Sequence, residues 1–193
     1  LLTKEEALLK VEAEALDQLL HKQLDDDSKK DATVLTTGLP ASPGAAVGKV
    51  VFNAEDAKMK KEQGEKVILV RTETSPEDIE GMDAAEGILT ARGGMTSHAA
   101  VVARGMGKCC VAGCSDVLVS EKSKVFEINE MKFQEDDIIT LDGSTGEVFA
   151  GELKLVGPKL TGNFGKLIYY FSSTTIPSKY YAFDFKRIKI FLL

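Results

Sequence analysis

Hydrophobic and polar positions along this chain form short segments that predict a mixed α/β domain. Over residues 3–24, apolar residues recur at helical spacing while Glu and Lys fill the other face, which predicts an amphipathic helix. The polar run DDDSKKDAT over residues 25–33 has nothing to bury, so it is predicted to be a linker. Beyond it, short apolar segments separated by glycine-rich turns predict a strand-rich domain over residues 34–158.

Within this domain the apolar segments alternate with helix signals. Strands are predicted over residues 48–52, 66–70, 87–91, 124–128 and 137–141, a strand and turn over 108–114, and a hairpin in LDGSTGEVFAGE. One helix is predicted over residues 54–64. A second starts at the N-cap Ser75, with Pro76 at the first helical position. A third covers about 97–104 and ends at Gly105 or Gly107.

The final segment has a different composition. Residues 161–193 hold nine of the chain's 13 aromatic residues and carry a net charge of +4, from five Lys or Arg and one Asp. Their apolar residues show no clear period, which leaves two interpretations: a β-rich extension, or sequence that never evolved to fold here, such as translated non-coding message. We favour the second. The predicted organisation is therefore a helix and linker from a preceding domain over 1–33, the domain over 34–158, and an irregular tail over 159–193.

Charge and hydropathy exclude some classes of function. The net charge of −6 argues against nucleic acid as the main partner, because phosphate backbones require a basic surface. No apolar run approaches the ~20 residues of a membrane span, and the acidic first segment is not a secretory signal. The first residue is Leu, which predicts a piece of a longer chain whose targeting peptide, if any, lies upstream.

The three cysteines, Cys109, Cys110 and Cys114, lie within six residues of each other. An odd, clustered set does not form a disulfide framework and indicates a reducing compartment. The spacing C-C-x-x-x-C has no second pair and no neighbouring histidine, so buried apolar cysteines are predicted rather than a zinc site.

The stretch ARGGMTSHAAVVARG, residues 91–105, carries one of the chain's two histidines, His98. A histidine that accepts a phosphoryl group must be a neutral imidazole, and the product needs hydrogen-bond donors for its oxygens. The positive end of a helix disfavours the imidazolium form, and its free N–H groups bind phosphate. Gly93 and Gly94 let the backbone come close, while Thr96 and Ser97 add hydroxyl groups. These residue types predict a phosphate site, although a capping hydroxyl beside an incidental histidine would give the same pattern.

Other polar residues are weaker candidates. Arg92 is a cation beside the loop that could steer phosphate, whereas Arg104 is predicted to be structural because it lies about 240° round the helix from His98. A metal role for His98 is disfavoured, since valines occupy the positions three and four residues later. Asp142 and Glu147 are predicted to belong to a tight hairpin rather than to a paired-carboxylate site. His21 is predicted to be a solvated or interdomain residue on the first helix. The acidic run at 25–27 is predicted to be solvated linker rather than a metal site.

GGMTSHAAVVAR resembles the phosphohistidine signature of the PEP-utilising enzymes. TGLPASPGAAVGKVVF, VILVRTETSPEDIEGM, AAEGILTARGGMTSHAAVVARGMGKCCVAGC and LDGSTGEV resemble the pyruvate phosphate dikinase family in particular. The similarity is nearly gap-free over roughly residues 1–167, after which the chain departs from the family's pattern.

The resemblance implies a swivelling β/β/α domain in which His98 becomes a tele-phosphohistidine. It would accept a phosphoryl group from the β-phosphate of ATP at an ATP-grasp domain and pass it to pyruvate at a (β/α)₈ barrel, reversibly giving phosphoenolpyruvate. It also implies a homodimeric enzyme in the cytoplasm or plastid stroma, with Mg²⁺ bound by those two other domains and no cofactor in this chain. In plant members of the family, a bifunctional regulatory protein phosphorylates the threonine that aligns with Thr96. A PEP synthase-like carrier and an inert fragment that acts as a binding module are the alternatives.

Overall fold

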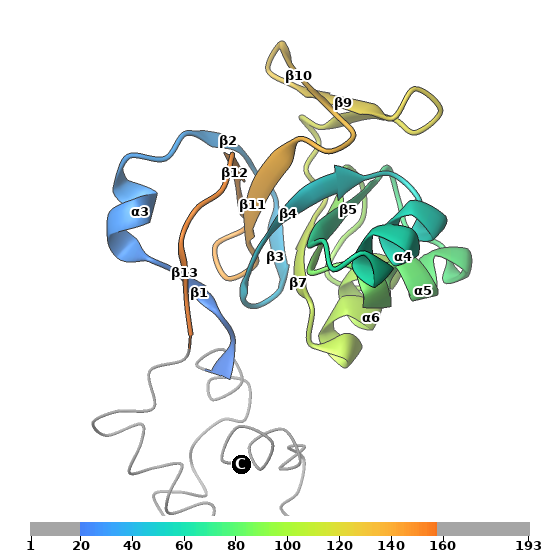
Figure 1. Cartoon of the computed structure of the whole chain (residues 1–193), viewed down its shortest axis with the longest axis horizontal. Helices are drawn as coiled ribbons and strands as arrows, with labels where there is room; N and C mark the ends of the chain where they lie inside the picture. The colour runs from blue at the N-terminus through green and yellow to red at the C-terminus, as the bar shows by residue number, and fades with distance from the viewer. Residues whose placement is uncertain (1–19, 158–193) are drawn as a thin grey trace, which may run out of the picture. The chain divides into compact units, whose positions relative to one another are not determined.

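The computed structural model describes residues 20–157, and residues 21–156 form one compact unit. Its main element is an eight-stranded mixed sheet with the order β2-β12-β11-β4-β5-β6-β7-β3 (Figure 1). The strands are β2 (Val34–Thr37), β3 (Leu39–Ser42), β4 (Ala45–Val51), β5 (Val67–Arg71), β6 (Gly87–Thr90), β7 (Cys109–Ala112), β11 (Ile138–Asp142) and β12 (Glu147–Ala150). The predicted mixed α/β class is confirmed, and the predicted strands over 66–70 and 87–91 are β5 and β6.

The four central strands β4, β5, β6 and β7 are parallel. Each connection between them contains a helix, because a parallel pair needs a crossover. These helices are α4 (Ala54–Glu62), the 3₁₀ turn η1 (Pro76–Asp78) with α5 (Ile79–Ala84), and α6 (His98–Met106). The carboxyl ends of the central strands therefore meet at one edge of the sheet, which is where open α/β sheets usually bind ligands.

Both faces of the central strands are buried, which explains the uninterrupted apolar run of β5. Val67 and Leu69 pack with alanines of the helices, and Figure 1 shows α4, α5 and α6 together on that side of the strands. Ile68 and Val70 face the opposite side and pack in a cluster that includes Phe126. The alternation of side chains along a strand thus places a hydrophobic core on each face of the central strands.

Phe126 belongs to a second, three-stranded sheet with the order β10-β9-β8. Its strands are β8 (Leu118–Ser120), β9 (Val125–Ile128) and β10 (Met131–Gln134). Phe126 stacks on Phe133 of β10 with ring centroids 4.9 Å apart. The sequence predicts β9 but neither β8 nor β10.

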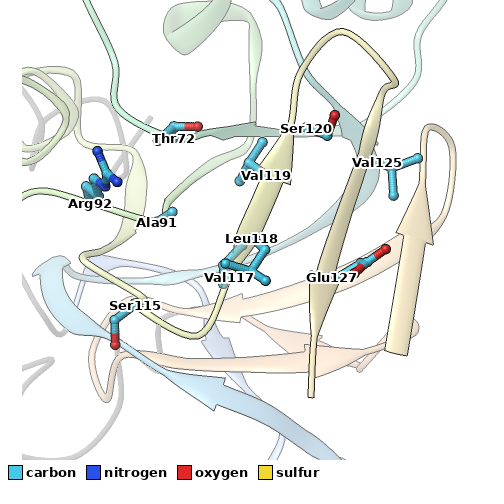
Figure 2. A pocket seen from close by; sticks show the side chains of 10 residues that line it. All are labelled: Thr72, Ala91, Arg92, Ser115, Val117, Leu118, Val119, Ser120, Val125 and Glu127. Atoms are coloured by element: carbon cyan, nitrogen blue, oxygen red, sulfur yellow. The ribbon is translucent and has the colours of Figure 1, made fainter. Parts of the chain in front are cut away.

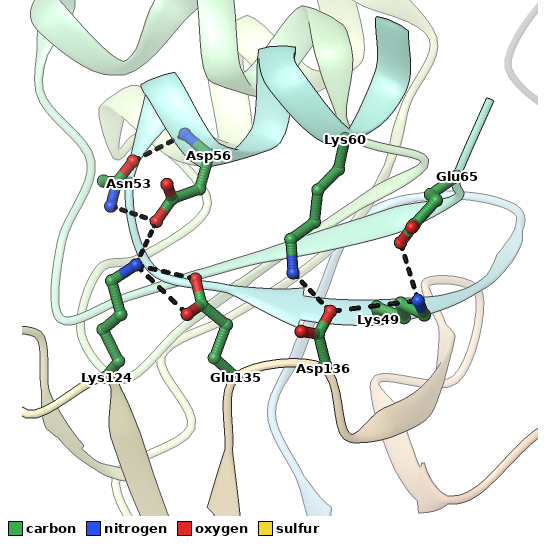
Figure 3. A network of polar contacts seen from close by, with 8 residues as sticks. All are labelled: Lys49, Asn53, Asp56, Lys60, Glu65, Lys124, Glu135 and Asp136. Atoms are coloured by element: carbon green, nitrogen blue, oxygen red, sulfur yellow. Dashed lines mark hydrogen bonds and ion pairs between the residues drawn. The ribbon is translucent and has the colours of Figure 1, made fainter. Parts of the chain in front are cut away.

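A polar network joins this second sheet to α4 (Figure 3). Asn53 caps α4 by accepting from the Asp56 N–H at 2.7 Å, and Lys124 bonds the Asp56 carboxylate at 2.6 Å. Burial raises the pKa of Asp56, but the hydrogen bonds from Lys124 and Asn53 outweigh burial and hold that pKa below its usual range. Lys60 pairs with Asp136, so α4 is also attached to the turn between β10 and β11.

The segment predicted as a linker over residues 25–33 is partly helical. Asp25 accepts from the Ser28 N–H and caps the short helix α3 (Asp26–Lys30). Lys29 forms ion pairs with Asp142 at 3.0 Å and Glu147 at 2.5 Å, and lies 5.5 Å from the Phe149 ring centroid. The linker prediction is wrong here because the residue that anchors the helix is polar and its partners lie more than 100 residues away.

The predicted helix over 3–24 is wrong at its end, where β1 (Gln23–Leu24) pairs with β13 (Leu155–Val156). His21 therefore lies outside a helix, and a Cβ on Gly44 would approach the His21 Cβ to 3.1 Å. The rest of that predicted helix and the atypical tail lie outside the described residues. Among residues 20–157, no helix has the length and apolar character needed to cross a membrane.

Replacing Lys29 with Met is expected to lower the free energy of unfolding by about 1–2 kcal/mol at pH 7, because two partly buried carboxylates lose their cation. Hydrogen bonds from Lys29 and Thr145 hold the pKa of Glu147 below its usual range. A carboxyl group whose pKa is lower in the folded protein than in the unfolded chain stabilises the fold at a pH above the unfolded pKa. This stabilisation is lost as the pH falls through the folded pKa. The difference between the two proteins should therefore shrink below about pH 4.

Urea unfolding from pH 7 to pH 3 measures this difference. Lys30→Met is the matched control, because Lys30 pairs only with exposed Asp27 among the described residues, and its expected effect is below about 0.5 kcal/mol. A difference between Lys29→Met and the unchanged protein that stays constant down to pH 3 would contradict the assignment of the effect to the carboxylates.

Candidate functional site

The stretch around His98 lies at the carboxyl edge of the parallel strands. After β6 the backbone turns at Gly93, whose φ of +115° is a conformation that side chains rarely allow. Ser97 then caps α6 by accepting from the Ala100 N–H at 3.3 Å, and Gly107 ends the helix in the left-handed conformation. The predicted helix is confirmed, and His98 is its first residue.

Small residues seat α6 on the sheet. Ala99, Ala100 and Ala103 are almost completely buried in the core beneath the helices. Val101, by contrast, is 53% exposed, so the alanines pack the helix against the sheet and this valine does not. The close approach of the alanines fixes the position of the first helical turn, and with it the backbone of His98.

Thr74 contacts the imidazole of His98. Its Oγ1 lies 3.0 Å from the His98 Nδ1, while no residue among 20–157 is hydrogen-bonded to Nε2. Thr74 follows β5, the parallel neighbour of β6, so the two strand ends bring Thr74 and the His98 loop together. The sequence analysis missed Thr74. The signal that could have found it is the polar segment directly after a buried strand.

Arg104 supports the loop that precedes His98. Its guanidinium donates to the Met95 carbonyl at 2.6 Å and to the Ala41 carbonyl at 3.3 Å. The predicted structural role of Arg104 is thus confirmed: it ties the loop to α6 and to β3. Thr96, the next residue of the loop, is exposed and stands two residues before His98.

Gly93 and Gly94 differ in their surroundings. A Cβ on Gly93 would lie 2.9 Å from the Ser97 Cβ, whereas a Cβ on Gly94 would meet no atom within 4 Å. The Gly94 carbonyl accepts from the Ser97 N–H at 3.0 Å. Both glycines therefore lie against Ser97, the residue that caps the helix on which His98 stands.

Arg92 lies in a pocket of about 450 Å³ (Figure 2). Figure 2 shows Arg92 and Ala91 on one side of the pocket and strands β8 and β9 on the other. No described residue forms an ion pair with the guanidinium, and no hydrogen bond joins the side chains of Arg92 and His98. The pocket residues are Thr72, Ala91, Arg92, Ser115, Val117, Leu118, Val119, Ser120, Val125 and Glu127.

The remaining candidates are structural. Asp142 accepts from the N–H groups of Ser144 and Thr145 at 3.0 and 3.3 Å and faces Glu147 across the β11–β12 pair, which confirms the hairpin.

All three cysteines are buried and unpaired. Burial raises the pKa of Cys110 and Cys114 to about 12 and that of Cys109 further, so these thiols are poor nucleophiles. No group of three or more potential metal ligands occurs in the described part of the chain.

Comparison with known proteins gives consistent matches. Residues 63–146 match the family PEP-utilising enzyme, mobile domain. The chain is 55% identical over 168 residues to a pyruvate, phosphate dikinase of Clostridium symbiosum, and this match covers 87% of the chain and 19% of the relative. It is 58% identical over 161 residues to the chloroplastic pyruvate, phosphate dikinase 1 of Arabidopsis thaliana, a match that covers 83% of the chain and 17% of that relative. The chain thus spans about a fifth of the length of these relatives.

The matched region contains the Gly-Gly pair, Thr96, Ser97 and His98, together with the strands that place them. By these matches the chain carries the mobile domain of PEP-utilising enzymes and is homologous to a region of pyruvate, phosphate dikinase.

Proposed function

We propose that residues 34–158 act as the phosphoryl carrier of a pyruvate phosphate dikinase-type enzyme, with His98 as the acceptor. The observation that carries this proposal is the environment of the imidazole. Nδ1 is engaged by Thr74, and Nε2 has no partner among the described residues at the amino end of α6. A neutral ring that donates its Nδ1–H to Thr74 keeps the Nε2 lone pair for attack on phosphorus.

In the first transfer, Nε2 bonds to the β-phosphorus of ATP while the bond from this phosphorus to the α-phosphate oxygen breaks, and AMP leaves with the electron pair. Inorganic phosphate then attacks the γ-phosphorus, the γ-phosphoryl group leaves as pyrophosphate, and the β-phosphoryl group stays on Nε2. Free N–H groups at the start of α6 and the hydroxyls of Thr96 and Ser97 are available to the phosphoryl oxygens. In the second transfer, the enolate oxygen of pyruvate attacks phosphorus and the bond to Nε2 breaks. The ring then returns to its neutral form with Nδ1 still on Thr74.

The donor and acceptor sites belong to parts of the enzyme outside this chain. We expect an ATP-grasp domain to present ATP with its Mg²⁺ and a (β/α)₈ barrel to present pyruvate, with this unit swivelling between them. The compactness of residues 21–156 supports movement as one body. We assign the protein to the cytoplasm or the plastid stroma, in agreement with its three unpaired thiols.

Thr96 is proposed as a regulatory phosphorylation site. Its side chain is exposed, and it lies two residues before His98. A phosphate there would add about two negative charges two residues from His98 and would occupy the donors that the transferred group needs. Phosphorylation of Thr96 would therefore switch the carrier off.

The test is to mix the chain with the ATP-grasp half of a dikinase, ATP labelled in the β-phosphate, inorganic phosphate and Mg²⁺. Acid-labile label on the chain is expected, and His98→Asn should remove it. Label that survives in His98→Asn would overturn the assignment of the acceptor. Absence of label on the unchanged chain would favour an inert fragment.

Replacing Thr74 with Val is expected to slow labelling of His98 about tenfold, because the ring loses one hydrogen bond that holds its productive form. Thr74→Ser is the matched control, since it keeps the hydroxyl, and it should stay within about threefold of the unchanged rate. Single-turnover labelling by rapid quench measures both rates. Equal slowing by Ser and Val would contradict the assignment to the hydrogen bond, because Ser keeps the hydroxyl.

A further inference from the structure

The segment that carries Thr74 is held at both of its ends. Residues 72–75 lead from the end of β5 to η1. At one end, Glu121 Oε1 accepts from the Thr72 N–H at 3.2 Å. At the other end, Asp78 Oδ2 accepts from the Ser75 N–H at 2.9 Å. Only Glu73 and Thr74 lie between these two anchored amides, so the backbone at Thr74 has little freedom.

A single guanidinium joins the two carboxylates. Arg71 Nη1 donates to Glu121 Oε2 at 2.7 Å, and Arg71 Nε lies 3.4 Å from Asp78 Oδ1. The same Nη1 also donates to the Phe52 carbonyl at 3.0 Å, which fixes the guanidinium to the end of β4. The side chains of Arg71, Asp78 and Glu121 are 20%, 7% and 34% exposed, so these pairs are shielded more than pairs on the surface.

We propose that Arg71, Asp78 and Glu121 form a clamp that positions Thr74 so that its hydroxyl oxygen accepts from the His98 Nδ1–H, which selects the tautomer with a free lone pair on Nε2. Each carboxylate uses one oxygen for the guanidinium and the other for a backbone N–H of the 72–75 segment. The segment is therefore fixed relative to β4 and β5, and Thr74 Oγ1 is directed at Nδ1. The inference rests on the proposed function in one respect: the tautomer matters because Nε2 is taken as the nucleophile.

The clamp also gives the second sheet a role in the site. Glu121 lies in the turn between β8 and β9, whereas Arg71 and Asp78 come from the β5–α5 connection. Part of the clamp is therefore supplied by a sheet that forms no hydrogen bond to the His98 side chain among the described residues. Lys124 supports the turn that carries Glu121, because its N–H donates to the Glu121 carbonyl at 3.2 Å and its side chain bonds Asp56 of α4.

The test compares Glu121→Gln with Glu130→Gln. An amide has one acceptor oxygen, so Gln at 121 must lose either the guanidinium contact or the Thr72 N–H. Glu130 is exposed in the next turn of the same sheet and has no partner among the described residues, which makes it the matched control. Nitrogen-15 NMR of the imidazole in the full chain measures the ratio of the Nδ1–H and Nε2–H tautomers, and the amide spectrum verifies folding.

Glu121→Gln is expected to lower the Nδ1–H to Nε2–H ratio about threefold to tenfold, and to slow labelling by a similar factor. Glu130→Gln should leave both unchanged. In a Thr74→Val background, Glu121→Gln should have no further effect on the ratio, because the clamp acts through Thr74. Asp78→Asn is the second variant, with the same expected direction.

Two results would overturn the clamp: an unchanged ratio in folded Glu121→Gln, or an equal effect of Glu121→Gln with and without Thr74. The NMR measurement needs no ATP and no partner domain. If the unchanged chain takes no label while Glu121→Gln still shifts the tautomer ratio, the proposed function fails and the clamp stands.

Discussion

Replacing Gly93 with Ala is expected to slow labelling of His98 about a hundredfold, because displacing a reacting group by about 1 Å has effects of this size. The φ of +115° at this position strains any residue with a side chain. The added Cβ would also lie 2.9 Å from the Ser97 Cβ and 3.0 Å from its Oγ, the atom that caps α6. The loop must therefore shift at the point where it sets the first turn of the helix and the histidine.

Gly94→Ala is the matched control, because it makes the same chemical change one residue later. No atom lies within 4 Å of a Cβ on Gly94, and its φ is not in the left-handed region. We expect its labelling rate to stay within about threefold of the unchanged protein. Equal losses in the two variants would mean that the glycines act through contact with the incoming phosphate rather than through the loop conformation.

Replacing Gly143 with Ala is expected to lower the free energy of unfolding by about 3–5 kcal/mol, a size of effect that follows from overpacking in a confined site. The new Cβ would lie 2.1 Å from the Ser42 carbonyl oxygen and 3.1 Å from the Gly44 carbonyl oxygen. Both atoms belong to the backbone, so neither moves away without disturbing the turn before β4. The Gly143 N–H donates to the Gly44 carbonyl at 2.7 Å, and this bond would be lost as well.

Urea unfolding compares this variant with Gly105→Ala. Gly105 lies inside α6, and a Cβ there would meet no atom within 4 Å. Alanine favours a helix interior more than glycine, so this control should raise the free energy of unfolding by about 0.5–1 kcal/mol. A loss below about 1 kcal/mol for Gly143→Ala would show that the turn relaxes easily.

Local signals in the sequence predict the part of the site that lies on α6. Ser97 as the cap, the glycine at the end of the helix and the Gly-Gly turn are each interactions over a few residues. The buried strands β5 and β6 are also predicted, because continuous apolar runs of this length are typical of a parallel sheet. His98 could thus be placed at the amino end of a helix without a structure.

The rest of the site depends on contacts that no local pattern contains. Thr74 is 24 residues from His98, and Glu121 is 50 residues from Arg71. β8 and β10 are short and mostly exposed, so they lack the alternation that predicts a strand. The helix α3 was missed for the same reason, because it buries no apolar side chain and is anchored through Lys29.

The pairing of β1 with β13 has a consequence for engineering. Gln23 is opposite Val156, so the chain enters and leaves this unit on adjacent strands. A unit whose two ends are neighbours can be inserted into a surface loop of another protein without distorting the unit or the loop. Such a unit also tolerates circular permutation. Residues 21–156 could therefore be inserted as one unit into another protein. Their original ends could also be joined by a short peptide to give a circular permutant.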